Sequence, residues 1–63
     1  MQIVYNVSGK VYRYEVYYPG TGTKYYVRKL AKGGKKIGKD QGFSSETAAR
    51  LEANRRANSE GLI

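Results

Sequence analysis

The sequence contains no cysteine, no histidine and no tryptophan, and it has a single proline. No disulfide can form without cysteine, and the usual zinc-binding clusters need cysteine or histidine. No stretch approaches the ~20 apolar residues that span a bilayer, and residues 1–7 lack the basic start and cleavage site of a signal peptide. We therefore expect one cytoplasmic domain over residues 1–63, with a thin core and no contact with a membrane.

The basic residues are concentrated in one part of the chain. Lysine and arginine total 12 against 5 aspartate and glutamate, which gives a net charge of +7. No acid occurs between Glu15 and Asp40, and residues 24–39 contain seven bases. A single-signed stretch of this kind favours contact with phosphates, because mixed charges would serve solubility equally well. The charge predicts duplex DNA as the partner, with RNA or an acidic protein as alternatives.

The composition changes near Gly42. Valine, isoleucine and tyrosine, which favour strands, dominate before it, and alanine, glutamate and arginine, which favour helix, dominate after it. Turn residues divide the first part into strands over about 2–7, 10–18, 24–31 and 35–39. The helix is expected over about 45–60, beginning at Ser44 or Ser45 and ending at Gly61. The sequence predicts an α+β fold, in which a three- or four-stranded antiparallel β-meander packs against one C-terminal α-helix.

The turn lengths also predict which side chains share a face of the sheet. Two-residue turns at 8–9 and 33–34 and a five-residue loop at 19–23 set the pairing of the strands. The core face then collects Ile3, Tyr5, Val7, Tyr12, Tyr14, Val16, Tyr26, Leu30 and Ile37, and the helix packs on it with Phe43, Ala48, Leu51 and the alanines at 49, 53 and 57. The second face collects Val11, Arg13, Glu15, Tyr17, Tyr25, Val27, Lys29 and Lys36. A change of one residue in the 19–23 loop would exchange the faces of the third and fourth strands.

Most of the candidate DNA-binding residues lie on this second face and on the basic hairpin around Gly33-Gly34. Arg28 falls on the core face in this register and would have to extend past its edge to reach solvent. Lysines would neutralise phosphates, and Arg13, Arg28 and Lys29 are the candidates for reading base edges. Tyr17 and Tyr25, expected opposite each other, either stack on bases or sugars or simply pack within the protein, and packing is the simpler explanation. The full candidate set is Arg13, Lys24, Tyr25, Arg28, Lys29, Lys32, Lys35, Lys36 and Lys39.

No pattern in the sequence indicates catalysis. The acids show no useful pairing, and no base accompanies Ser44-Ser45, whose hydroxyls are explained by helix capping. The pair Gly33-Gly34 lacks the strand–loop–helix context of a phosphate-binding loop. We expect a non-enzymatic protein with no catalytic residue, no metal site and no cofactor.

The run K-Y-Y-V-R-K-L-A-K-G-G-K-K-I-G-K-D-Q-G-F-S-S-E-T-A-A-R, which begins at Lys24, resembles the N-terminal arm-type DNA-binding domain of phage integrases. The DNA-binding domain of plant ethylene-responsive transcription factors follows the same plan, although its tryptophans are missing here. The resemblance implies a three-stranded sheet that lies in the major groove, backed by one helix. Carried onto matching positions, it implicates Tyr25, Arg28, Lys29, Lys35 and Lys36. A module of this size could bind DNA but not recombine it.

A second resemblance covers residues 14–58. The segments Y-E-V-Y, K-Y-Y-V-R-K-L-A-K-G-G-K-K-I and G-F-S-S-E-T-A-A are similar to the YegP-like family of small, uncharacterised proteins. Members of that family pair two such repeats, in tandem or as a dimer, so one copy implies a homodimer. This resemblance supports the alternative function, a protein–protein interaction module such as a mobile-element inhibitor of a host protein.

Overall fold

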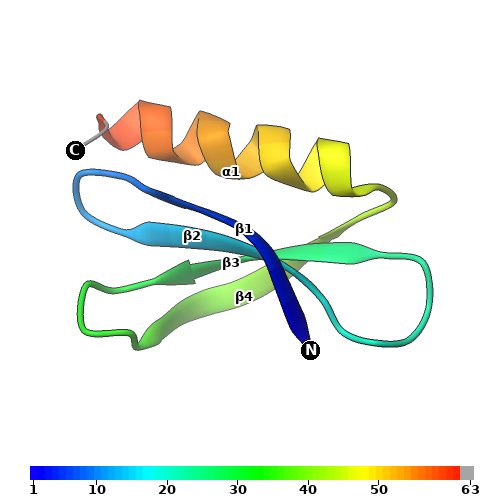
Figure 1. The fold of residues 1–63 in the computed structure, drawn as a ribbon. Helices are drawn as coiled ribbons and strands as arrows, with labels where there is room; N and C mark the ends of the chain where they lie inside the picture. Colours follow the sequence, from blue (N-terminus) through cyan, green and yellow to red (C-terminus); the bar gives the residue numbers. More distant parts are fainter. Residues whose placement is uncertain (62–63) are drawn as a thin grey trace.

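The computed structural model describes residues 1–61, which form four strands followed by one helix. The strands are β1 (Gln2–Ser8), β2 (Arg13–Tyr18), β3 (Tyr25–Leu30) and β4 (Lys36–Phe43), and the helix is α1 (Glu46–Glu60). The strands make one antiparallel sheet in the order β1-β2-β3-β4, and α1 lies across one face of it (Figure 1). The predicted α+β fold, a meander backed by a C-terminal helix, is confirmed.

The helix begins and ends where capping residues stand in the sequence. The hydroxyl of Ser45 accepts a hydrogen bond from the Ala48 N–H at 3.2 Å. At the other end Gly61 has a φ of +87°, and its N–H donates to the Asn58 carbonyl at 3.1 Å. Both contacts satisfy backbone groups that a helix end leaves unpaired. The expected helix is therefore confirmed to within one residue.

The core between the helix and the sheet is small and rich in alanine. Val16 and Val27 pair across β2 and β3, and both are fully buried. The helix contributes three fully buried side chains at a spacing of four, which are Ala49, Ala53 and Ala57. Alanine lets the helix approach the sheet closely but removes little apolar area from water. The expected packing of Leu51 against the sheet is wrong, since this side chain is 65% exposed.

The β2–β3 loop is one residue longer than the sequence predicts. It covers residues 19–24, so that Val16 pairs with Val27 instead of Tyr26. The Tyr18 hydroxyl holds the loop by donating to the Gly22 carbonyl at 2.8 Å. A shift of one residue moves every side chain of a strand to the other face of the sheet. The predicted faces of β3 are therefore exchanged.

The exchange has a clear physical reason. The observed register buries Val27 in the core, whereas the predicted one would place Arg28 there. A guanidinium in an apolar core without a partner is costly, because it loses its hydration. Tyr25, Val27 and Lys29 consequently face α1, and Tyr26, Arg28 and Leu30 lie on the sheet face opposite α1, which we call the open face.

The β1–β2 connection is also longer than predicted. Residues 10–12 belong to the turn rather than to β2, and the Gly9 N–H donates to the Tyr12 carbonyl at 2.7 Å. A bulge between Ile3 and Tyr5 bends β1, so that Val4 packs against the core. The predicted core position of Ile3 is wrong for this reason, and its side chain is 39% exposed.

The last strand and its turn differ from the prediction in length. β4 runs to Phe43 instead of ending near Lys39, with an irregularity in its pairing where Gly38 adopts a φ of +73°. In the β3–β4 turn Ala31 donates its N–H to the Lys35 carbonyl at 2.8 Å, and Gly34 donates to Ala31 at 2.8 Å. The Ala31–Lys35 hydrogen bond leaves residues 32–34 as a three-residue loop. Such a loop requires a positive φ at its last residue, and Gly34 has a φ of +97°. The hairpin exists, but its loop is longer than the predicted two residues.

Candidate nucleic-acid interface

The basic side chains form two groups that differ in whether an acid neutralises them. All five arginines and Lys36 form ion pairs, with nitrogen–oxygen separations of 2.7 to 3.4 Å. Six lysines have no acidic partner among residues 1–61, namely Lys10, Lys24, Lys29, Lys32, Lys35 and Lys39. The predicted site residues are divided between these groups, because Arg13, Arg28 and Lys36 are paired and the others are not.

On the open face two arginines converge on one buried acid. Glu15 is only 9% exposed, and its carboxylate receives the Arg28 Nη2 at 2.7 Å and the Arg28 Nε at 2.9 Å. Arg13 Nη2 lies 3.4 Å from the other oxygen. This two-pronged contact uses the edge of the Arg28 guanidinium that would otherwise read guanine. Arg13 and Arg28 therefore lie on the same face of the sheet, whereas the predicted register places them on opposite faces, and Glu15 neutralises both.

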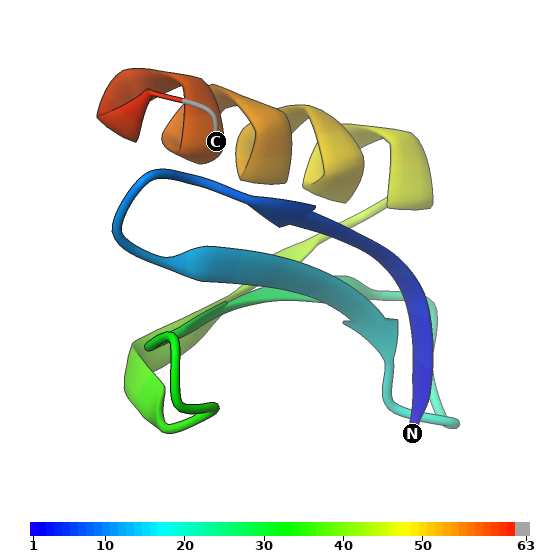
Figure 2. The same cartoon turned by 60° about the vertical axis from the view of Figure 1, so that its left-hand side comes forward.

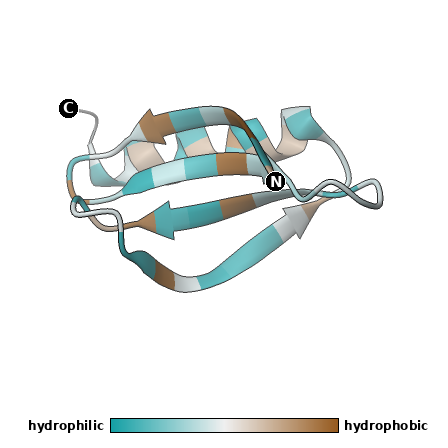
Figure 3. Ribbon diagram, turned by 60° about the horizontal axis from the view of Figure 1, so that its bottom comes forward, coloured by the Kyte–Doolittle hydropathy of each residue, from teal (hydrophilic) through white to brown (hydrophobic). Residues whose placement is uncertain are grey.

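The rest of the open face is closed by a second acid. The Tyr17 hydroxyl donates to Asp40 Oδ2, and Lys36 Nζ lies 3.2 Å from Asp40 Oδ1. Burial, followed by the hydrogen bond to Asp40, raises the pKa of Tyr17 to about 12. The Arg28 guanidinium carbon lies 5.5 Å from the centre of the Tyr17 ring. Figure 3 looks onto this side of the sheet and shows β4 as mostly hydrophilic, whereas β3 also carries apolar residues. The charges of the open face are largely paired with one another.

Tyr17 and Tyr25 do not lie opposite each other as the sequence predicts, because Tyr17 pairs with Tyr26. Tyr17 stacks on Tyr26, with ring centres 5.5 Å apart and an angle of 19° between the planes. Tyr25 lies on the face toward α1, packs against the core, and meets the Tyr18 ring at 5.3 Å. The shift in register accounts for the difference. The structure therefore does not bring Tyr25 together with Arg13 and Arg28.

Free lysines gather at one end of the sheet. The β1–β2 turn carries Lys10, and the β3–β4 turn carries Lys32 and Lys35. Figures 1 and 2 show both turns at the end where α1 finishes, and Lys32 Nζ joins them by donating to the Gly9 carbonyl at 3.2 Å. All three lysines are exposed. We call these two turns, with Lys10, Lys32 and Lys35, the basic end.

The basic end contains one residue that the sequence analysis missed. The sequence predicts Lys10 at the start of a strand and not as a binding residue, although its position directly after the turn residues Ser8-Gly9 is a signal for an exposed turn lysine. The other free lysines lie elsewhere, since Lys24 is exposed at the opposite end of the sheet and Lys39 is exposed on β4. Neither Lys24 nor Lys39 forms an ion pair with Glu15 or Asp40, the acids of the open face.

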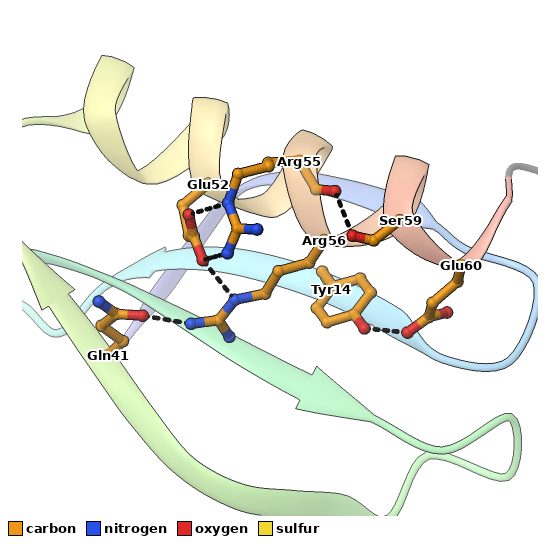
Figure 4. A network of polar contacts seen from close by, with 7 residues as sticks. All are labelled: Tyr14, Gln41, Glu52, Arg55, Arg56, Ser59 and Glu60. Carbon is orange, nitrogen blue, oxygen red and sulfur yellow. Dashed lines mark hydrogen bonds and ion pairs between the residues drawn. The ribbon is translucent and has the colours of Figure 1, made fainter.

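Lys29 lies in a groove of about 330 Å³ between the helix and the sheet, on the side away from Arg13 and Arg28. The groove is lined by Tyr14, Lys29, Arg55, Arg56, Ser59 and Glu60, and Figure 4 shows most of these side chains. Lys29 Nζ lies 4.6 Å from the centre of the Tyr12 ring. The predicted placement of Lys29 on the same face as Arg13 is therefore wrong, for the same reason of register.

The acid in this groove is fully engaged by neutral donors. Glu60 receives the Tyr14 hydroxyl and the backbone N–H groups of Val11 and Tyr12, the latter two at 3.1 and 3.0 Å. Burial works to raise the pKa of Glu60, but these hydrogen bonds outweigh it and hold the pKa below its ordinary value. Burial, followed by the bond to Glu60, raises the pKa of Tyr14 to about 12. These contacts tie the end of the helix to the β1–β2 turn.

The helix arginines are neutralised along the helix itself. Glu52 accepts from Arg55 Nη2 at 2.7 Å and from Arg56 Nε at 2.7 Å, and Arg56 also donates to Gln41 (Figure 4). Hydrogen bonding from Arg55, and then from Arg56, lowers the pKa of Glu52 to about 2 against the effect of burial. Together with Glu46, which pairs with Arg50 at 3.4 Å, these contacts leave little free charge on α1.

Comparison with known protein families, with characterised proteins and with solved structures gives no match to this chain. Over residues 1–61 no helix is long and apolar enough to cross a membrane. The same residues contain no group of three or more acidic side chains placed to hold a metal ion. The assignment of function therefore rests on the geometry and charge described above.

Proposed function

We propose that the protein is a small non-enzymatic module that binds duplex DNA, with the lysines of the basic end on the phosphates. The observation that carries the proposal is the difference in pairing between the two kinds of base. Each carboxylate of residues 1–61 is engaged by an arginine, by Lys36, or by the donors around Glu60. The exposed lysines of the basic end thus have no acidic partner, because the nearby Glu60 is already held by Tyr14 and by the backbone N–H groups of the β1–β2 turn. The natural partner of these lysines is an anion.

The shape of the β3–β4 turn supports contact with a phosphate backbone. A side chain added at Gly33 or Gly34 would meet no atom within 4 Å, so the tip of the hairpin stands in open space. Glycine at the tip lets the backbone itself approach a ligand, while Lys32 and Lys35 flank it. A hairpin of this form can follow a groove edge and contact phosphates on either side.

Phosphate contact gives affinity without sequence discrimination. Arg28 is the best candidate for reading guanine, but its Nη2 and Nε groups already donate to Glu15. Lysine acts on a phosphate as a point charge and needs no fixed geometry. We therefore expect binding that depends steeply on salt and weakly on the base sequence. Lys24 and Lys39 would add contacts only where the DNA extends beyond the basic end.

The proposal is tested by the salt dependence of binding to a random-sequence duplex, followed by fluorescence anisotropy. The double variant Lys32→Gln/Lys35→Gln should lower the slope of log affinity against log salt by about 2, because each phosphate contact contributes about 0.9. The matched control Arg50→Gln/Arg55→Gln removes the same charge from ion pairs on α1 and should leave the slope nearly unchanged. Absence of binding at about 50 mM salt, or equal effects of the two variants, would contradict the proposal.

A further inference from the structure

The two edges of the sheet differ in charge. The outer strand β4 carries Lys36, Lys39 and Asp40 and is distorted at Gly38, features that prevent another strand from pairing with it. The other outer strand, β1, has the sequence Q-I-V-Y-N-V-S, with no charge and no proline over its whole length. Its outer backbone groups have no strand partner within the described sheet. Such an edge is a ready site for the addition of a further strand.

The helix continues this uncharged surface above β1. Asn54 accepts a hydrogen bond from the Tyr5 hydroxyl at 2.7 Å, which fixes one side of α1 over β1. Residues at spacings of three and four share a helix face, so Asn54 belongs to a stripe with Thr47, Leu51 and Asn58. None of the four is charged, and Leu51 is 65% exposed at the centre of the stripe. The neighbouring Arg50 is paired with Glu46 and stacks on the Tyr5 ring at 4.5 Å.

We infer that two copies of this chain associate through β1, as antiparallel strands about a two-fold axis, with the helix stripes facing each other. A chain of net charge +7 repels a second copy, so self-association requires a surface without free charge. Two-fold pairing matches the surface with itself, and β1 with its helix stripe is suited to this. The result would be a continuous eight-stranded sheet that carries a basic end at each side.

The small core favours a second copy of this chain as the partner that covers β1. Among residues 1–61 only Val16 and Val27 of the larger side chains are completely buried, and the helix contributes alanines. The chain has no disulfide, since cysteine is absent, and oligomerisation is one of the remaining ways in which so small a scaffold gains stability. Pairing of β1 and burial of Leu51 would add apolar contact where each copy has least. The inference does not depend on DNA binding.

Sedimentation equilibrium from micromolar to millimolar protein tests the inference, with the Leu51→Lys variant compared with Ser59→Lys. The wild type should reach twice the 7.1 kDa mass of the chain. Leu51→Lys should weaken dimerisation at least about ten-fold, because it places like charges near the two-fold axis. Ser59→Lys adds the same charge on the groove side of α1 and should leave the dimer intact. A monomer at every concentration would overturn the inference and leave β1 open to a foreign strand.

Hydrogen exchange locates the interface independently of any variant. Backbone amides of β1 should become protected as the protein concentration rises, whereas those of β4 should not. A dimer whose β1 amides exchange at the same rate at all concentrations would use another surface, and the inference would be wrong. Equal weakening by Leu51→Lys and Ser59→Lys would also overturn it, because the effect would then come from net charge alone.

Discussion

The open face and the basic end each hold three bases, yet they differ in what those bases can bind. On the open face Arg13, Arg28 and Lys36 are held by Glu15 and Asp40. At the basic end three lysines face solvent with no acid in contact among residues 1–61. The arginines use their planar guanidinium groups to bind carboxylates within the protein, whereas the lysines of the basic end keep hydrated charges in solvent. A local excess of charge therefore does not by itself identify a binding surface.

The largest expected effect follows from removing the acid that closes the open face. Glu15→Gln leaves Arg13 and Arg28 without a charged partner in a half-buried site, so the free energy of unfolding should fall by about 2 kcal/mol. The freed guanidinium groups should also strengthen DNA binding at low salt. Urea unfolding and anisotropy measure the two effects. The control Glu46→Gln removes one exposed pair and should cost less than about 0.5 kcal/mol. Equal costs for both variants would show that Glu15 does not organise the open face.

Two glycines allow the same substitution in each region. A Cβ at Gly42 would lie 3.0 Å from the Tyr26 ring, which stacking on Tyr17 holds in place, so Gly42→Ala should cost about 1 kcal/mol. A Cβ at Gly33 would meet nothing within 4 Å, and Gly33→Ala should be neutral or slightly stabilising. Thermal unfolding of both variants measures the difference. A larger loss for Gly33→Ala would contradict the description of a packed open face and an open hairpin tip.

The smallest expected effect is a loss of stability at high pH, which does not occur at neutral pH. Tyr17 on the open face and Tyr14 beside the basic end each donate to a carboxylate, and their pKa values are raised to about 12. A raised pKa means that the neutral phenol is stabilised in the folded state, so this stability is present below pH 10 and is lost between about 10 and 12. Absorbance titration should show two late phenols. Tyr17→Phe and Tyr14→Phe should each remove one of them, and two unchanged late phenols in either variant would contradict the assignment.

The sequence predicts the elements of this fold well because their signals are local. Ser45 and Gly61 mark the ends of the helix through contacts with their own neighbours, and the alanine spacing of four marks its buried side. Strand register depends instead on loop length, and the loop at 19–24 contains two glycines, which leave its length open. The deciding factor, burial of Val27 in preference to Arg28, acts between segments that are distant in the sequence.

The candidate site could be predicted only in part for the same reason. The hairpin lysines Lys32 and Lys35 are exposed whatever the register, so their prediction survives the shift. The grouping of Lys29 and Tyr25 with Arg13 depends on one residue of register and is wrong. Pairing of the arginines with acids involves contacts between strands, which no local pattern in the sequence reveals. DNA binding itself stays a prediction from charge, now located at the basic end.

The central claim is that the free lysines of the basic end, and not the paired arginines of the open face, contact DNA. Backbone amide chemical shifts of isotope-labelled protein, followed during titration with a random-sequence duplex, test it most directly. The account predicts that the shifts concentrate in the two turns, over residues 9–12 and 31–35. Shifts concentrated instead at Arg13, Tyr17 and Arg28, with the turns unaffected, would contradict it.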